Sequence, residues 1–310
     1  MIMRILHRPS ELAAGSRKVC LAIGVFDGVH LGHQQVLRKS ISDARHHEAA
    51  AVVVTFDRHP NAIVAPERTP PLVYSLAQKL RVIASLEPDA ALLIAFDKPF
   101  SELSGETFIR NLARDFGQIH SVCVGATFTF GYKRSGNVAL LKALGQELKF
   151  VVHGLAAVSL DGKIVSSTRI REAIRAGNLE AASQMLGRTY ALAGAVVHGD
   201  HLGRQLGFPT ANLDITGLAI PPHGVYAVQA RLENRIQRAV VNIGHRPTLQ
   251  EPAPPLRVEV HLLDFAGDLY GQEMEITFVE KLREEERFPN RAALQAQLAR
   301  DVQAARDLFN

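Results

Sequence analysis

Cysteine and tryptophan are scarce in this sequence, whose 310 residues include two cysteines and no tryptophan. Two cysteines cannot supply the disulfide framework that small secreted domains use. Cys20 and Cys123 each lie in an apolar, strand-like run, where a small buried thiol is the simplest interpretation. The cysteine content therefore indicates a reducing compartment, and we expect a cytoplasmic protein.

Long apolar runs and concentrated charge are missing as well. No run approaches the length of a membrane span, and the N-terminus lacks the charged, apolar and small-residue succession of a signal peptide. The net charge is only +4, and the nearest thing to a charge run, residues 283–287, mixes both signs. A nucleic-acid binder would need a basic surface interleaved with aromatic side chains, which we do not find. The mildly basic balance favours polyanionic small molecules instead.

The first half of the chain alternates apolar runs with helical patterns. A helix over 75–87 is indicated by its helical spacing of apolar residues, which follows a capping pair, Ser75 and Gln78. Apolar strands separated by helices are typical of a parallel sheet covered on both faces, with ligands bound at the carboxyl ends of the strands. The predicted strands are Val19–Ile23, Ala51–Phe56, Ala90–Phe96, Val122–Gly125 and Leu148–Val152.

The stretch Gly24–His33 joins the first of these strands to a helix predicted over about 34–45. The first amide N–H groups of a helix lack intrahelical partners, so this place attracts phosphate oxygens. His30 and His33 share one face of the first turn, and Gly32 between them lets phosphate approach the backbone. Two imidazole donors suit nucleotidyl transfer, because they can follow the charge that develops on an α-phosphate. The alternative is two surface histidines near a helix start.

Other polar residues follow equivalent strand ends. Asp57 and His59 come after the second predicted strand, and the loop 125–134 comes after the fourth. Because carboxyl ends of parallel strands meet at one edge, these loops and the histidine stretch can converge on one pocket.

A further anion site is indicated in the segment Val165–Arg171, where hydroxyl side chains precede a helical pattern. Ser167 or Thr168 can cap that helix, and its first amide groups together with Arg171 would bind an anion. An ordinary helix cap with surface arginines is the alternative. Together with the histidine stretch, this segment would bind a triphosphate from the opposite side.

Beyond about Gly187 the pattern changes to strand-like runs joined by turns, which is typical of an antiparallel barrel or sandwich. A final helix over about 291–308 has one apolar side and is expected to pack across that barrel. We place the domain boundary so that residues 1–185 form the first domain and 186–310 the second. The predicted strands are Tyr190–His198, Val225–Leu232, Ile236–Ile243, Val258–Phe265 and Met274–Val279.

The second half offers side chains for phosphoryl transfer. The loop Gly199–Asn212 contains three glycines spaced by four residues and suits a flap over phosphates. Within it, Thr210 and Asn212 offer neutral oxygens, which suit a magnesium ion that takes its other ligands from phosphate and water. Glu259 alternates with valines in a strand, so a solvated glutamate is one interpretation. The other is the carboxylate that phosphoryl transfer to a hydroxyl needs.

These motifs together resemble the bacterial bifunctional riboflavin kinase and FMN adenylyltransferase family, also called FAD synthetase. The resemblance covers nearly the whole chain, and its most specific motif is Gly-Phe-Pro-Thr-Ala-Asn. The matching segments are Gly24–His33, Thr55–Pro60, Val165–Arg171, Gly207–Asn212 and Val258–His261.

The resemblance implies a Rossmann-like α/β nucleotidyltransferase domain, followed by an all-β kinase domain built on a six-stranded antiparallel barrel with a C-terminal helix. It also implies two reactions. ATP with Mg²⁺ phosphorylates riboflavin to FMN, and a second ATP then adenylylates FMN to FAD with release of pyrophosphate.

The resemblance also assigns residues to these reactions. Glu259 would be the base of the kinase, with Thr210 and Asn212 on Mg-ATP, and His30 and His33 would serve the adenylyltransferase. The flavin would be bound by Asp57, His59, Thr127 and Phe128. The nucleotides would be bound by Gly24, Phe26, Asp27, Gly32, Ser166, Ser167, Thr168, Arg171, Gly203, Arg204 and Gly207.

Two positions depart from the family pattern. Thr127 stands where an acidic or amide side chain is usual, and Arg58 stands where proline is common. Both lie in the adenylyltransferase half, so the alternative function is a riboflavin kinase with a weak or silent adenylyltransferase half. A binding protein without turnover would predict loss of Glu259 or of the paired histidines, and all of these are present. Phe128 and Phe130 are candidates to contact the isoalloxazine ring, with core packing as the alternative.

Overall fold

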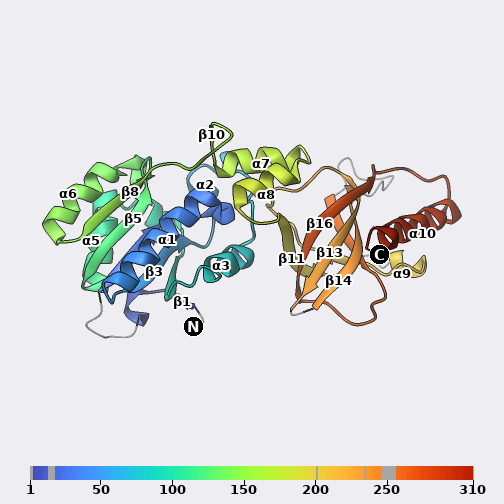
Figure 1. Cartoon of the computed structure of the whole chain (residues 1–310), viewed down its shortest axis with the longest axis horizontal. Helices are drawn as coiled ribbons and strands as arrows, with labels where there is room; N and C mark the ends of the chain where they lie inside the picture. The colour runs from blue at the N-terminus through green and yellow to red at the C-terminus, as the bar shows by residue number, and fades with distance from the viewer. Residues whose placement is uncertain (1–2, 13–17, 200–201, 234, 246–255, 310) are drawn as a thin grey trace. The chain divides into compact units, whose positions relative to one another are not determined.

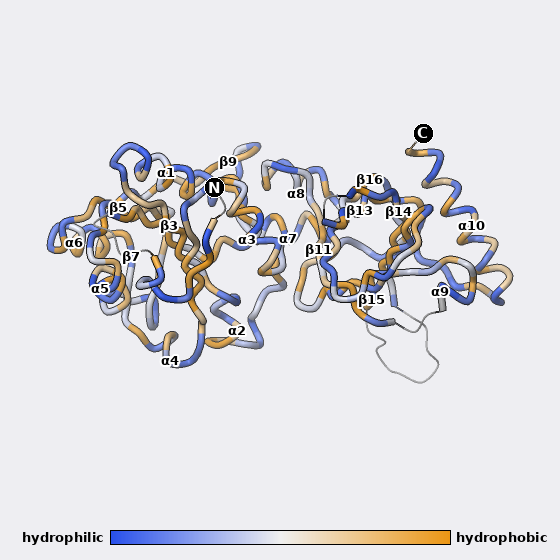
Figure 2. Tube along the Cα trace, turned by 90° about the horizontal axis from the view of Figure 1, so that it is seen from below, coloured by the Kyte–Doolittle hydropathy of each residue, from blue (hydrophilic) through white to orange (hydrophobic). Residues whose placement is uncertain are grey.

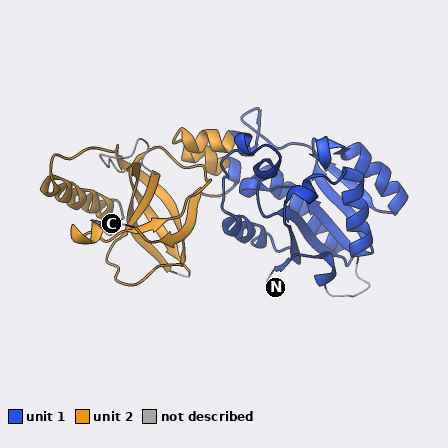
Figure 3. Cartoon of the chain, turned by 180° about the vertical axis from the view of Figure 1, so that it is seen from behind, with its two compact units in different colours: residues 1–168, 185–187 blue, residues 169–184, 188–310 orange. Residues whose placement is uncertain are grey.

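The computed structural model describes residues 3–12, 18–199, 202–233, 235–245 and 256–309. The chain divides into two compact units, which are described separately below (Figure 3). The first comprises residues 1–168 and 185–187, and the second comprises 169–184 and 188–310. Contacts thus group 169–184 with the second unit, and the sequence domains 1–185 and 186–310 stay a proposal.

The first unit is built on a six-stranded sheet in which all neighbouring strands are parallel, as predicted (Figure 1). The strand order is β1-β4-β3-β2-β5-β8, and two small hairpins lie outside it. The strands are β1 (Arg4–Leu6), β2 (Val19–Ile23), β3 (Ala50–Phe56), β4 (Ala90–Ile94), β5 (Ile119–Gly125), β6 (Thr129–Phe130), β7 (Gly136–Asn137), β8 (Val151–Leu155), β9 (Ser159–Leu160) and β10 (Lys163–Ile164). The helices of this unit are α1 (Leu31–His46), α2 (Asn61–Val64), α3 (Leu76–Ala84), α4 (Lys98–Ser101), α5 (Gly105–Phe116) and α6 (Val138–Leu148), with short 3₁₀ turns at Pro9–Glu11, Asp27–Val29, Pro66–Arg68 and Tyr132–Arg134. Helix α7 (Ser167–Arg175) begins in this unit, and its residues from Arg169 on belong to the second.

Apolar side chains cover both faces of this sheet, and the strands are mainly hydrophobic in Figure 2. On one face, Leu21 and Val52 pack in a cluster with residues of α5 and α6. On the other, Ala22 and Val53 pack with residues of α1 and α3. Because successive residues of a strand point to opposite faces, continuous apolar strands are required here. Cys123 is fully buried, as expected, and burial raises the pKa of its thiol to about 12.

A buried polar cluster joins α1 to the sheet. The carboxylate of Asp43 accepts hydrogen bonds from Lys39 Nζ (2.7 Å) and Ser121 Oγ (3.1 Å), and His153 Nε2 lies 3.0 Å from it. Burial alone would raise the pKa of Asp43, but the hydrogen bond from Lys39, the charge of His153 and the hydrogen bond from Ser121 outweigh it and lower the pKa below its ordinary 3.8. A lowered carboxyl pKa gives stability that is present above the ordinary value and is lost as pH falls through the folded value.

We therefore expect Asp43→Ala to reduce the free energy of unfolding by about 1 to 3 kcal/mol at pH 7, because buried donors lose their acceptor. The difference from the natural chain should begin to shrink as pH falls below the ordinary carboxyl pKa of 3.8 and vanish once pH has passed the lower pKa of the folded chain. Denaturant unfolding at several pH values measures both effects. Asp115→Ala, on the exposed side of α5, is the control and should change little.

The second unit is a closed barrel of six antiparallel strands in the order β11-β12-β15-β14-β13-β16, which confirms the six-stranded barrel that the resemblance implies. Its C-terminal helix α10 packs against β13, β14 and β16. The strands are β11 (Ala191–Val197), β12 (Ala211–Leu213), β13 (Gly224–Leu232), β14 (Arg235–His245), β15 (Leu256–Leu262) and β16 (Glu273–Arg283). The remaining helices are α8 (Leu179–Leu186), α9 (Leu202–Gln205) and α10 (Arg291–Leu308).

Candidate active sites

The carboxyl edge of the parallel sheet brings three of the predicted loops together. β2 lies between β3 and β5, so the turn after β2 is flanked by the loops that follow these two neighbours. The chain builds outward from β2 through β3 to β4 and then returns to place β5 on the other side of β2. Such a reversal of strand order is where open α/β sheets bind ligands.

The turn Gly24–His33 has an unusual backbone. Phe26, Gly28 and Val29 all have positive φ angles, of 53°, 77° and 43°. The left-handed region suits glycine but is strained for a β-branched residue such as valine, at a cost of about 1 to 3 kcal/mol. Strain of this kind persists only where surrounding contacts fix it.

Asp27 supplies those contacts. Its buried carboxylate accepts a hydrogen bond from the Val73 N–H group through Oδ1 (2.9 Å). Its carbonyl oxygen accepts a hydrogen bond from Ser167 Oγ (2.9 Å), the first residue of α7. The start of α7 is therefore held against the turn, and Arg171 follows one helical turn later in α7. That the two segments bind one triphosphate stays a prediction.

The two histidines stand at the N-terminus of α1. His30 is the N-cap, and its Nδ1 accepts a hydrogen bond from the His33 N–H group (3.4 Å). The two rings stack with centroids 3.6 Å apart, and the Phe26 ring lies perpendicular to the His33 ring with their centroids 5.4 Å apart. A side chain at Gly32 would contact the His30 ring, so this glycine makes room for the imidazole. The structure thus places both imidazoles side by side beside the first amides of the helix.

Polar side chains in the loop after β3 form hydrogen bonds that hold the loop in place. Asp57 Oδ1 accepts a hydrogen bond from the Phe96 N–H group (2.9 Å), and Oδ2 accepts from Arg58 Nε and Nη2 (3.0 and 2.8 Å). Burial would raise the pKa of Asp57, but the hydrogen bonds from Arg58 and Phe96 lower it. His59 Nδ1 accepts from the Asn61 N–H group (3.1 Å). Arg58, a departure from the family pattern, therefore has a structural partner in this chain.

The loop after β5 presents Thr127 on its exposed side. Phe128 is half-buried and stacks on Phe130 with ring centroids 5.1 Å apart. The Phe130 ring lies where a side chain at Gly136 would be, so it belongs to the packing of this loop. Both Phe128 and Phe130 pack against the apolar cluster on this face of the sheet. Contact of either ring with the isoalloxazine stays a prediction.

In the barrel, Glu259 lies at the centre of a polar row. It pairs with Asn212 across the β12–β15 ladder and with Asn242 across the β14–β15 ladder. Its neighbours Val258 and Val260 are buried, so Glu259 points away from the barrel core, as strand alternation predicted. Sequence reasoning missed Asn242, although an amide between Val241 and Ile243 in an apolar strand was a usable signal.

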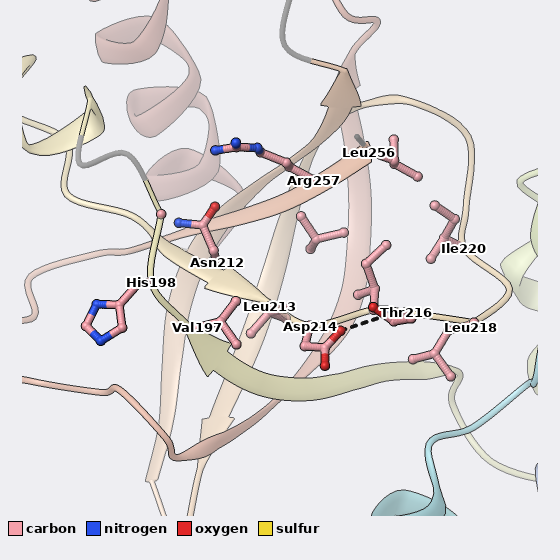
Figure 4. Close-up of a pocket in the computed structure, with 14 residues that line it drawn as sticks. Val197, His198, Asn212, Leu213, Asp214, Thr216, Leu218, Ile220, Leu256 and Arg257 are labelled. Carbon is pink, nitrogen blue, oxygen red and sulfur yellow. Dashed lines mark hydrogen bonds between the residues drawn. The ribbon is translucent and has the colours of Figure 1, made fainter. Parts of the chain in front are cut away.

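Two pockets adjoin this row of residues. One, of about 480 Å³, is lined by Asn212 and Arg257 together with apolar residues such as Leu218 and Ile220 (Figure 4). The other, of about 590 Å³, is lined by Thr210, Asn242, Glu259 and His261, by Arg257 again, and by the apolar side of α10 with Leu294, Leu298 and Val302. Both volumes suit small molecules of nucleotide or cofactor size.

The glycine-rich loop is fitted closely to β12. A side chain at Gly199 would collide with the Asn212 carboxamide, and one at Gly203 would meet Phe208 and Thr210. His261 Nδ1 lies 2.8 Å from the Pro209 carbonyl oxygen and fixes the chain just before Thr210. Gly207 has a positive φ of 86° and Arg204 is exposed, while residues 200–201 of the loop lie outside the described residues.

The oxygen donors in the barrel are of the kind that magnesium accepts, since Thr210 offers a hydroxyl, Asn212 an amide oxygen and Glu259 a carboxylate. Across the described ranges, no group of three or more His, Cys, Asp and Glu residues could hold a metal ion by itself. A magnesium ion held by Thr210 and Asn212, with phosphate oxygens and water as its other ligands, stays a prediction. Within the same ranges, no helix is long and apolar enough to cross a membrane.

Comparisons with known proteins agree with this geometry. Residues 13–169 match the FAD synthetase family model, and residues 186–309 match the riboflavin kinase family model. Relatives named bifunctional riboflavin kinase/FMN adenylyltransferase are found in Haemophilus influenzae (36% identity over 100% of this chain and 99% of the relative), in Escherichia coli K12 (37%, over 99% and 98%) and in Pseudomonas fluorescens (39%, over 99% and 98%). A crystal structure of a chain named a macrolide-efflux protein from Streptococcus pneumoniae is 27% identical, with a TM-score of 0.79 over 99% of each chain.

Proposed function

Because the chain belongs to the family of bifunctional riboflavin kinases and FMN adenylyltransferases, we propose how its residues divide two consecutive reactions. The chain is an enzyme with both activities: ATP phosphorylates riboflavin to FMN, and ATP then adenylylates FMN to FAD. The observation that carries the residue assignment is the position of Glu259 between Asn212, which lines one pocket, and Asn242, which lines the other together with Glu259.

For the kinase reaction, we assign ATP to the 480 Å³ pocket and riboflavin to the 590 Å³ pocket. Glu259 orients the ribityl 5′-hydroxyl and accepts its proton as the oxygen bonds to the γ-phosphorus. The bond from the γ-phosphorus to the bridging oxygen then breaks, and ADP leaves. Asn212, from the ATP pocket, and Thr210, from the riboflavin pocket, would hold Mg-ATP, and the magnesium ion would neutralise charge that develops on the phosphates.

For the adenylyltransferase reaction, an oxygen of the FMN phosphate attacks the α-phosphorus of ATP, and pyrophosphate leaves. The nucleophile is already an anion, so no general base is needed. His30 and His33 and the first amides of α1 donate hydrogen bonds to the phosphate oxygens as charge moves toward pyrophosphate. Ser167 would bind the same triphosphate, Arg171 keeps its nucleotide-binding role by the family resemblance alone, and Phe128 would contact the flavin.

The direct test is product analysis by chromatography after incubation of the purified chain with riboflavin, ATP and Mg²⁺. We expect FMN to appear first and FAD to accumulate at its expense, and removal of Mg²⁺ by a chelator should stop FMN formation. FMN accumulating alone would overturn the adenylyltransferase assignment and leave a riboflavin kinase, with Thr127 as the first residue to exchange.

Gly199 provides a test of the ATP side of the kinase. Gly199→Ala places a methyl group against the Asn212 carboxamide, which must move away from its present position. We expect kcat/KM for ATP in FMN formation to fall at least roughly tenfold, equivalent to about 1.4 kcal/mol. Conversion of supplied FMN to FAD by the same preparation is the internal control. Unchanged kinase kinetics would remove Asn212 from the ATP site.

A further inference from the structure

A buried lysine lies beneath the adenylyltransferase loops. Lys79 belongs to α3, and only 7% of its surface is exposed. Its Nζ lies 2.8 Å from the Phe56 carbonyl oxygen, 3.3 Å from Thr55 Oγ1 and 3.4 Å from the Val25 carbonyl oxygen. An ammonium group has three N–H donors, and here each has an oxygen acceptor.

These acceptors lie where two substrate loops begin. Val25 is the second residue of the turn Gly24–His33, and Phe56 is the last residue of β3, directly before Asp57. Thr55 Oγ1 also donates a hydrogen bond to the Val25 carbonyl oxygen (3.2 Å), so its remaining lone pairs can accept from Lys79. One ammonium group thus ties the histidine turn to the Asp57 loop.

The charge of Lys79 is not matched by an ion pair among the described residues. All three acceptors are neutral, and the two carboxylates that act on it from a distance, Asp27 and Asp57, already accept hydrogen bonds from other groups. Burial lowers the pKa of Lys79 to about 8, against the opposing effect of these two carboxylates. Burying an unpaired charge is costly, and a neutral amide could also bridge two carbonyl oxygens. Hydrogen bonding alone therefore does not explain why a charged residue is buried at this position.

We propose that Lys79 is a positioning residue for FMN adenylylation, which holds the two loops in register through its protonated ammonium group and adds a buried positive charge to a site for polyanions. The inference rests on the proposed function of this unit. A triphosphate and a flavin phosphate bring several negative charges to the loops that Lys79 braces, and in a buried environment such attraction is screened less than in water. Lys79 acts through the loops and touches neither substrate.

This role predicts a particular pH dependence. When the ammonium group loses its proton it keeps two N–H donors for three acceptors and loses its charge, so kcat/KM for FMN adenylylation should fall as pH rises through about 8. Phosphate monoesters and histidine titrate near pH 6 to 6.5, below this range. Lys79→Arg keeps the charge at all these pH values, and Lys79→Met removes both the charge and the donors.

The experiment compares the natural chain with Lys79→Arg, Lys79→Met and the exposed control Lys142→Met, each supplied with FMN, ATP and Mg²⁺ from pH 6.5 to 9.5. In the natural chain we expect the alkaline decline near pH 8. Lys79→Met should lose at least roughly tenfold in kcat at pH 7.5 and show no such decline, while its KM for ATP changes less than kcat. Lys79→Arg should recover much of the activity and also lack the decline.

Riboflavin phosphorylation by the same preparations is the second readout, and it should be unaffected in every variant. FAD formation by the natural chain establishes the proposed function separately from the role of Lys79. Adenylylation within about threefold of the natural chain in Lys79→Met would overturn the inference. If Lys79→Met does not fold, the Arg variant decides: an alkaline decline that stays near pH 8 overturns the proposal, and one that disappears supports it.

Discussion

Replacing Glu259 by glutamine should reduce FMN formation from riboflavin by roughly 10² to 10⁴, the contribution of a positioned base. Glutamine has the same length and can fill the same place between Asn212 and Asn242, but it cannot accept the hydroxyl proton. The loss should appear mainly in kcat, because the side chain keeps its size and the two pockets keep their lining. Steady-state kinetics with riboflavin and ATP measures it.

Conversion of supplied FMN to FAD by Glu259→Gln should remain close to that of the natural chain. Glu280→Gln makes the same chemical change at an exposed position of another barrel strand and should affect neither reaction. Near-normal kinase turnover in Glu259→Gln would remove this residue from the role of base.

His33→Ala should reduce FAD formation from FMN and leave riboflavin phosphorylation intact. Removing one donor to the charge that develops during pyrophosphate release costs roughly 10² to 10³ in rate. His33 stacks on His30, so the remaining ring also loses its neighbour, and the rate of FAD formation from FMN should fall in kcat more than in the KM for ATP. Riboflavin phosphorylation by the same preparation should be retained.

His46→Ala tests whether any histidine of α1 would give this result, because His46 lies exposed at the other end of the same helix. We expect no change in either activity for this control. An equal loss of both activities in His33→Ala would instead indicate unfolding or coupled sites, and a normal adenylyltransferase rate would show that the imidazole is not used.

The sequence predicted elements best where local chemistry and packing agree. The strand Val19–Ile23 is found with the predicted bounds, and the Ser75 side chain caps α3 by accepting a hydrogen bond from the Gln78 N–H group (3.2 Å), as the capping pair indicated. The C-terminal helix Arg291–Leu308 also agrees. In both helices the side chain of an N-cap residue, Ser75 or Asn290, marks where the apolar pattern begins.

Errors arose where backbone geometry or long-range pairing decides. The strand predicted over 148–152 begins only at Val151, because α6 continues to Leu148 and ends at Lys149 in a left-handed conformation, with no glycine to mark it. The strand predicted to reach Phe96 ends at Ile94, since the Phe96 N–H group bonds to the Asp57 side chain instead of a neighbouring strand.

In the candidate sites, too, local motifs were predictable from the sequence, and features that depend on long-range pairing were not. The motif residues could be found one by one, but the three-residue strand β12 inside the glycine-rich loop was missed because so short a strand has no period of its own. Only barrel closure shows that Asn212 and Asn242 flank Glu259. The burial of Lys79 could not be predicted either, because a lysine in a helical pattern is normally interpreted as solvent-exposed until its hydrogen-bond acceptors are known.

The register of β15 limits which insertions and deletions the sequence can tolerate. Side chains along a strand alternate with a period of two, and Glu259 faces away from the core only because Val258 and Val260 occupy the inward positions. Deleting or inserting a single codon before Glu259 would turn the carboxylate into the barrel and the valines out of it. Such a frame-preserving change leaves the composition nearly intact yet would displace the proposed base and disrupt the core together, so length variation should be tolerated in the connecting loops and not within this strand.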